Sequence, residues 1–122
     1  MGNGPHVMVV DDEAVHRETL SVMLMNAGVK VTACENALDA LAVLRGDAVV
    51  DLILSDVLMP GMDGIEFSRQ ARQLRPGTPL VLVTGRDSAM DAVVTQGNIA
   101  LLKPYTADTL NGVLHEHLGI KI

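Results

Sequence analysis

Three aspartates in two separate stretches of the chain have the residue type and the setting that metal or phosphoryl chemistry requires. Asp11 and Asp12 end the apolar run 6–10, and Asp56 ends the run 49–55. Such runs are typical of buried strands, and the functional crevice of a parallel sheet lies outside the carboxyl ends of its strands. Three neighbouring carboxylates repel one another and need a cation beside them. The pattern therefore predicts an acidic, cation-binding pocket centred on Asp56.

Two further polar residues are expected at the same edge of the sheet. Thr84 follows the apolar run 80–83, and Lys103 follows the run 99–102. Three carboxylates and one ammonium leave a charge of −2, which one Mg²⁺ ion neutralises, and Mg²⁺ prefers hard oxygen ligands. Carboxylates are known nucleophiles toward phosphoryl groups and form aspartyl phosphates. We therefore expect Asp56 to accept a phosphoryl group, with the Thr84 hydroxyl within reach of a phosphoryl oxygen.

Short apolar runs alternate with helical stripes along the chain, which is the pattern of βαβ units. Leu38, Leu41 and Leu44, for example, predict the buried stripe of the second helix. Five such units joined by right-handed crossovers predict a flavodoxin-like α/β fold, a doubly wound five-stranded parallel sheet of order 2-1-3-4-5. The expected strands are 6–10, 30–34, 50–55, 79–83 and 99–102, and the expected helices are 13–27, 36–46, 63–74, 87–96 and 106–118.

Length and composition limit the classes of function. The 122 residues predict one domain over 6–122 after a flexible lead-in, 1–5. The net charge of −6 argues against direct binding of nucleic acid, which needs a basic footprint. No run approaches the roughly 20 apolar residues that span a bilayer, and no secretory signal is visible. We therefore expect no contact with a membrane. The lone Cys34 makes no disulfide framework, which favours a cytoplasmic protein.

Four motifs together resemble the receiver domains of two-component response regulators. The resemblance covers essentially the whole chain, and the order and spacing of the motifs make it specific although each motif alone is weak. The motifs are Val9-Val10-Asp11-Asp12-Glu13, Asp56-Val57-Leu58-Met59-Pro60-Gly61-Met62-Asp63-Gly64, Val83-Thr84-Gly85 and Lys103-Pro104-Tyr105.

The resemblance implies a role for each residue of the pocket. Asp56 would accept a phosphoryl group from a phosphohistidine of a sensor histidine kinase or a histidine phosphotransfer protein. Lys103 would pair with the phosphoryl group, and Thr84 would be the switch hydroxyl. The implied Mg²⁺ ligands are Asp12, Asp56 and the carbonyl of Leu58, with Asp11 acting largely through water.

The same resemblance implies how the signal leaves the domain. Phosphorylation would shift the face formed by the fourth helix, the fifth strand and the fifth helix, where a downstream protein or a second copy in a homodimer would bind. The domain would catalyse only its own phosphorylation and dephosphorylation, so it would not be an enzyme in the usual sense.

The sequence departs from the family pattern at two places. The family usually has an aromatic residue three positions before the lysine, where this chain has Ala100. The stretch from Thr84 to Lys103 is also short by about one helical turn, ~3.6 residues, which predicts a shortened fourth helix. This shortening is similar to receivers at the end of hybrid sensor histidine kinases.

Three other functions remain as alternatives. Ala100 favours a pseudo-receiver, which acts as an interaction domain without phosphorylation. A phosphatase of the haloacid dehalogenase type needs an aspartate two residues after its nucleophile, where this chain has Leu58. A flavin-binding module needs a Ser/Thr/Gly-rich phosphate loop where the chain has its acidic pair. Outside the pocket, we expect Asp63 to cap the third helix and His16 to lie on the surface of the first helix.

Overall fold

The fold is given by a computed structural model that describes residues 4–85, 99–102 and 105–119. Its strands are β1 (His6–Val10), β2 (Lys30–Cys34), β3 (Leu52–Asp56), β4 (Leu80–Thr84) and β5 (Ile99–Leu102). Its helices are α1 (Ala14–Asn26), α2 (Ala37–Leu44), α3 (Gly64–Leu74) and α5 (Ala107–Leu118). The expected helix 87–96, and with it the expected shortening, lies outside the described residues.

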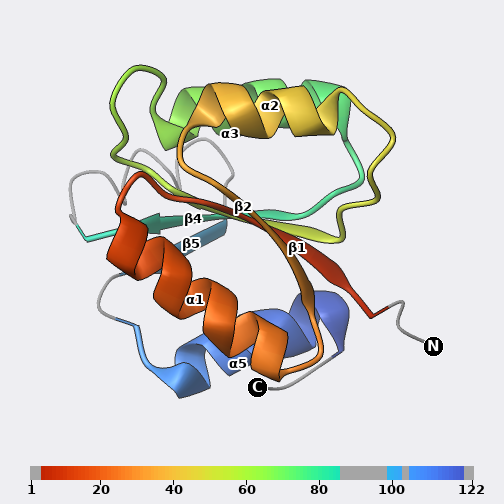
Figure 1. Cartoon of the computed structure of the whole chain (residues 1–122), viewed down its shortest axis with the longest axis vertical. Coiled ribbons are helices and arrows are strands. Elements are labelled where there is room, and N and C mark those ends of the chain that lie inside the picture. The colour runs from red at the N-terminus through yellow and green to blue at the C-terminus, as the bar shows by residue number, and fades with distance from the viewer. Residues whose placement is uncertain (1–3, 86–98, 103–104, 120–122) are drawn as a thin grey trace.

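The strands form one parallel sheet in the order β2-β1-β3-β4-β5, which confirms the predicted doubly wound topology. Helices α2 and α3 cover one face of this sheet, and α1 and α5 cover the other (Figure 1). Among the described residues, no helix combines the length and the apolar character needed to cross a bilayer.

The core consists of two layers, one on each face of the sheet, because successive side chains of a strand point to opposite faces. Met8 and Val10 of β1 pack into the layer beneath α2 and α3, which is built around the buried Phe67. Val7 and Val9 of the same strand pack into the layer beneath α1 and α5. Burial on both faces explains why β1, β3 and β4 are mostly apolar without alternation, whereas the edge strand β2 is only partly buried.

Two local predictions were wrong. The third strand begins at Leu52, two residues later than expected, and it includes Asp56 as its last residue. In the stripe predicted for α2, Leu41 and Leu44 are buried as expected, but Leu38 is 66% exposed. The buried face of α2 consists of Ala37, Ala40, Leu41 and Leu44.

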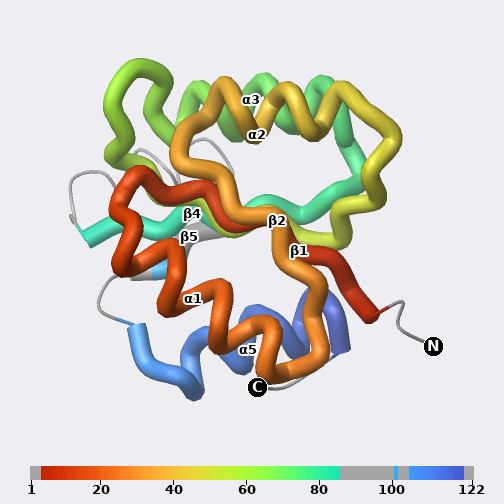
Figure 2. Tube along the Cα trace, in the orientation of Figure 1, coloured from red at the N-terminus to blue at the C-terminus, as the bar shows by residue number. Residues whose placement is uncertain are grey.

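The register of the sheet brings the carboxyl ends of its central strands together. Val10 of β1 is the partner of Ser55 of β3, so the residues that follow them, Asp11 and Asp56, are neighbours. Asp56 is in turn the partner of Val83, the residue before Thr84. The loops that leave β1 and β3 therefore share one edge of the molecule, at the left in Figure 2, away from the amino terminus.

Candidate functional site

Three carboxylates meet at the carboxyl edge of the sheet, as predicted. Asp11, Asp12 and Asp56 each offer one oxygen, and these oxygens all lie within 4.8 Å of one another. Asp11 is buried, Asp56 is half-buried and Asp12 is exposed, so this acidic cluster opens to solvent on one side. A set of hard carboxylate oxygens that is open to water fits a hydrated Mg²⁺ ion.

The backbone and side chain of Asp11 are held from three directions. Its N–H donates to the Cys34 carbonyl (3.1 Å), and its own carbonyl accepts from the Arg17 guanidinium (2.8 Å). Its Oδ1 accepts from the Glu13 N–H (2.9 Å), and Glu13, not Asp12, is the residue that begins α1 as its N-cap. These bonds aim the buried carboxylate of Asp11 at the cluster and leave Asp12 free of a capping role.

The loop after Asp56 is pinned to the start of α3. The Gly64 N–H donates to the Val57 carbonyl at 2.7 Å. A Cβ on Gly64 would lie 2.2 Å from the carbonyl oxygen of Asp56, so only glycine fits this close approach. As predicted, Asp63 caps α3, because its side chain accepts from the Glu66 N–H at 2.9 Å. Glycine at position 64 thus lets the start of α3 lie against the end of β3, and this contact positions Asp56.

The remaining predicted site residues differ in exposure, and one of them lies outside the described residues. Thr84 ends β4 with 1% of its surface exposed, and in the sheet register it is the partner of Leu102. Leu58 is 47% exposed in the loop after β3. Ala100 of β5 is the register partner of Leu82 of β4. Lys103 lies outside the described residues, so its predicted place at the pocket stays a prediction.

The structure adds a residue that the sequence analysis had assigned to the surface. The side chain of His16 is only 23% exposed, and its Nδ1 pairs with Oδ2 of Asp11. Its other ring nitrogen, Nε2, lies 3.2 Å from the hydroxyl of Tyr105, and the two rings meet edge to face at 69°. The prediction of a surface position for His16 was therefore wrong.

A pattern in the first helix could have revealed this position. The buried residues of α1 are Leu20, Ser21 and Leu24, and of these Leu20 and Leu24, four residues apart, pack into the core layer beneath the sheet. One step of four back from Leu20 arrives at His16, which must lie on the same face of the helix. Tyr105, whose hydroxyl lies beside Nε2 of His16, is also partly buried. This burial first, and then the charges of Asp11 and Asp56, raise the pKa of Tyr105.

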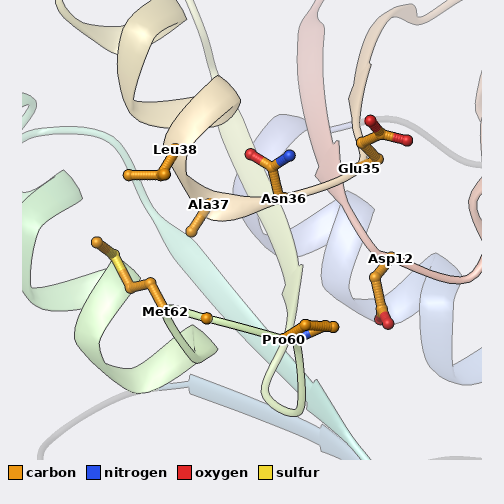
Figure 3. A pocket seen from close by; sticks show the side chains of 8 residues that line it. Asp12, Glu35, Asn36, Ala37, Leu38, Pro60 and Met62 are labelled. Carbon is orange, nitrogen blue, oxygen red and sulfur yellow. The ribbon is translucent and has the colours of Figure 1, made fainter.

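An open pocket of about 520 Å³ lies beside the acidic cluster. Asp12 and the loop that carries Pro60 flank it at one end, and Leu38 and Met62 lie toward the other end (Figure 3). A group that approaches the carboxylates along this pocket would therefore meet both acidic and apolar surface. The remaining lining residues are Glu35, Asn36, Ala37 and Gly61.

Comparison with known proteins agrees with this geometry. The chain is 34% identical over 113 residues to the C4-dicarboxylate transport transcriptional regulatory protein DctD of Rhizobium meliloti, a match that covers 90% of this chain and 24% of that protein. It is 35% identical over 117 residues to the autoinducer 1 sensor kinase/phosphatase LuxN of Vibrio campbellii, covering 94% of this chain and 14% of that protein. The chain thus spans a quarter or less of the length of these relatives.

The chain is also similar to a solved structure and matches a protein family. The response regulator TrrA of Thermotoga maritima, solved in complex with Mg²⁺-BeF, is similar with a TM-score of 0.83 and 26% identity, covering 93% of this chain and 99% of that one. The family described as the response regulator receiver domain matches residues 7–115. Because this match takes in both strand ends that carry the acidic cluster, the chain belongs to the response regulator receiver domain family.

Proposed function

We propose that this domain is a phosphorylation-dependent signalling module of a two-component system or phosphorelay, in which Asp56 accepts a phosphoryl group. The observation that carries the proposal is the convergence of three carboxylate oxygens within 4.8 Å at the carboxyl ends of β1 and β3. A structural role alone does not call for three like charges at this distance, since they repel. The receiver domain is residues 6–122 in this proposal, and 1–5 are a lead-in.

The residues of the site divide the work of phosphoryl transfer. A carboxylate oxygen of Asp56 attacks the phosphorus of a phosphohistidine, and a P–O bond forms as the P–N bond breaks. The imidazole nitrogen leaves with the bonding electron pair and takes up a proton from solvent. In the product, the Thr84 hydroxyl donates to a phosphoryl oxygen, and the Lys103 ammonium pairs with the same group.

Mg²⁺ is the proposed cofactor, because it neutralises the carboxylates and the charge on the phosphoryl oxygens when it is bound. Asp12, Asp56 and the carbonyl of Leu58 would hold it, with Asp11 acting largely through water. The exposure of Asp12 supports this role, since Mg²⁺ keeps several of its waters in protein sites.

The partner that supplies the phosphoryl group is a sensor histidine kinase or a histidine phosphotransfer protein. The pocket beside Asp12 supports this proposal, because it leaves room for a donor side chain next to the acids. The phosphorylated domain would pass the signal to a downstream protein, or to a second copy in a homodimer, through the face formed by the fourth helix, β5 and α5. A cytoplasmic location is part of this proposal.

The experiment that tests the proposal is the intact mass of the chain after incubation with acetyl phosphate and Mg²⁺. We expect one added phosphoryl group that is absent without the metal and absent in Asp56→Asn. An adduct that persists in Asp56→Asn would place the acceptor elsewhere. No adduct in the wild type, together with measurable Mg²⁺ binding, would favour the pseudo-receiver, the alternative that Ala100 supports.

A further inference from the structure

His16 makes two contacts for which the proposed phosphoryl transfer has no use. Its Nδ1 pairs with Oδ2 of Asp11 in the acidic cluster, and its Nε2 lies 3.2 Å from the hydroxyl of Tyr105. The two partners come from distant parts of the chain, since Asp11 is 5 positions from His16 and Tyr105 is 89 positions from it. One side chain of α1 therefore joins the end of β1 to the segment that follows β5.

The chemistry of the groups sets the direction of these hydrogen bonds. The ionised carboxylate of Asp11 can only accept, and its other oxygen already accepts from the Glu13 N–H at 2.9 Å. The Nδ1–H of His16 therefore donates to Asp11, and in the neutral ring Nε2 is an acceptor. In that neutral ring the Tyr105 hydroxyl donates to Nε2, whereas the Nε2–H of an imidazolium would donate to the hydroxyl; in both cases His16 links Tyr105 to Asp11.

Tyr105 stands at the start of α5. It directly precedes Thr106, the N-cap of that helix, whose side chain accepts from the Thr109 N–H at 3.1 Å. The ring of Tyr105 also packs on the core layer that contains Leu110 and Leu114 of α5. Any change in the bond between His16 and Tyr105 thus acts on the residue from which α5 begins.

We propose that His16 is a positioning residue that orients the carboxylate of Asp11 and couples the state of the acidic cluster to Tyr105. The inference rests on the proposed metal site. A cation among the carboxylates holds Asp11 in the orientation that its bond from His16 also favours, so binding of the cation alters that bond. Bonds in one chain polarise one another, so the alteration extends to the Tyr105 hydroxyl.

The composition of the chain supplies a direct readout. Tyr105 is the only tyrosine, and the chain has no tryptophan, so the tyrosine emission of the whole protein reports this one side chain. The emission of a phenol depends on what its hydroxyl is bonded to. We expect the emission of the metal-free wild type to change during titration with Mg²⁺, in step with the heat of binding measured by calorimetry.

Two substitutions separate the two bonds of His16. In His16→Asn, the amide nitrogen takes the place of Nδ1 and keeps a donor for Asp11, but the shorter side chain does not reach Tyr105. We expect Mg²⁺ affinity close to that of the wild type and no change in emission. In His16→Leu both bonds are lost, so we expect Mg²⁺ affinity to fall about tenfold, as when other outer-shell partners are removed, again without a change in emission.

The control is His115→Asn, the same substitution at an exposed position of α5, which should behave as the wild type in both measurements. Emission that stays constant in the wild type while calorimetry reports binding would overturn the inference and leave the proposed function intact. Emission in His16→Asn that follows the wild type would do the same. Absence of Mg²⁺ binding in the wild type would overturn the proposed metal site, and the inference with it.

Discussion

Replacing Gly64 with alanine should displace the loop that carries Asp56. The new Cβ would lie 2.2 Å from the Asp56 carbonyl oxygen and 2.8 Å from the Cα of Val57, whereas ordinary contacts begin at 3.4 Å. Both obstacles are backbone atoms, so no side-chain rotation relieves the clash. The start of α3 and the end of β3 must separate by more than 1 Å in this direction.

This displacement sets the size of two expected effects. Misplacing a reacting group by about 1 Å can cost a factor of ~100 in rate, so we expect Gly64→Ala to accept a phosphoryl group about 100-fold more slowly. Overpacking costs about 1–3 kcal/mol of unfolding free energy. The better helix preference of alanine returns about 1 kcal/mol at most, so we expect a net loss of stability.

The assay is the rate of phosphorylation by acetyl phosphate, followed by intact mass, together with urea unfolding. Gly112→Ala is the matched control, because Gly112 lies inside α5 and a Cβ there would meet nothing within 4 Å. This control should gain about 1 kcal/mol and react at the wild-type rate. If Gly64→Ala reacts at the wild-type rate and unfolds at the wild-type urea concentration, the close approach at Gly64 does not position Asp56.

Three further predictions follow from the described contacts. Burial first, and then the charge of Asp39, raise the pKa of the Cys34 thiol, so a thiol reagent at pH 8 should label the native protein far more slowly than the protein in urea. The pKa of Tyr105 is raised mainly by burial; its contribution to stability is therefore complete below about pH 10 and is lost as the pH rises through the folded-state pKa. Urea unfolding of the wild type should weaken more between pH 9 and pH 11 than that of Tyr105→Phe, and equal losses would contradict the shift. Asp63→Ala removes the bond to the Glu66 N–H and should cost about 1 kcal/mol, and an unchanged urea midpoint would show that this cap contributes nothing.

Much of the acidic cluster could be predicted from the sequence, because its geometry follows from local patterns and one topological rule. The apolar runs that end in Asp11 and Asp56 predict buried strands, and parallel strands place their carboxyl ends at one edge. Neighbouring positions for the first and third strands then bring the aspartates together, as the pairing of Val10 with Ser55 confirms. The cap at Asp63 was predictable for the same reason, since it involves only residues of the first turn of α3.

Other features were decided only by the tertiary structure. The spacing of Leu38, Leu41 and Leu44 cannot say which side of α2 meets the sheet, and packing left Leu38 in solvent. The contacts of His16 depend on three segments that meet only in the folded chain: α1, the end of β1 and the residue before the N-cap of α5. Periodicity places His16 on the inner face of its helix, but the partner that it finds there is 89 residues away. Local spacing constrains neighbours along the chain, whereas pairings over such separations are set by how whole elements pack.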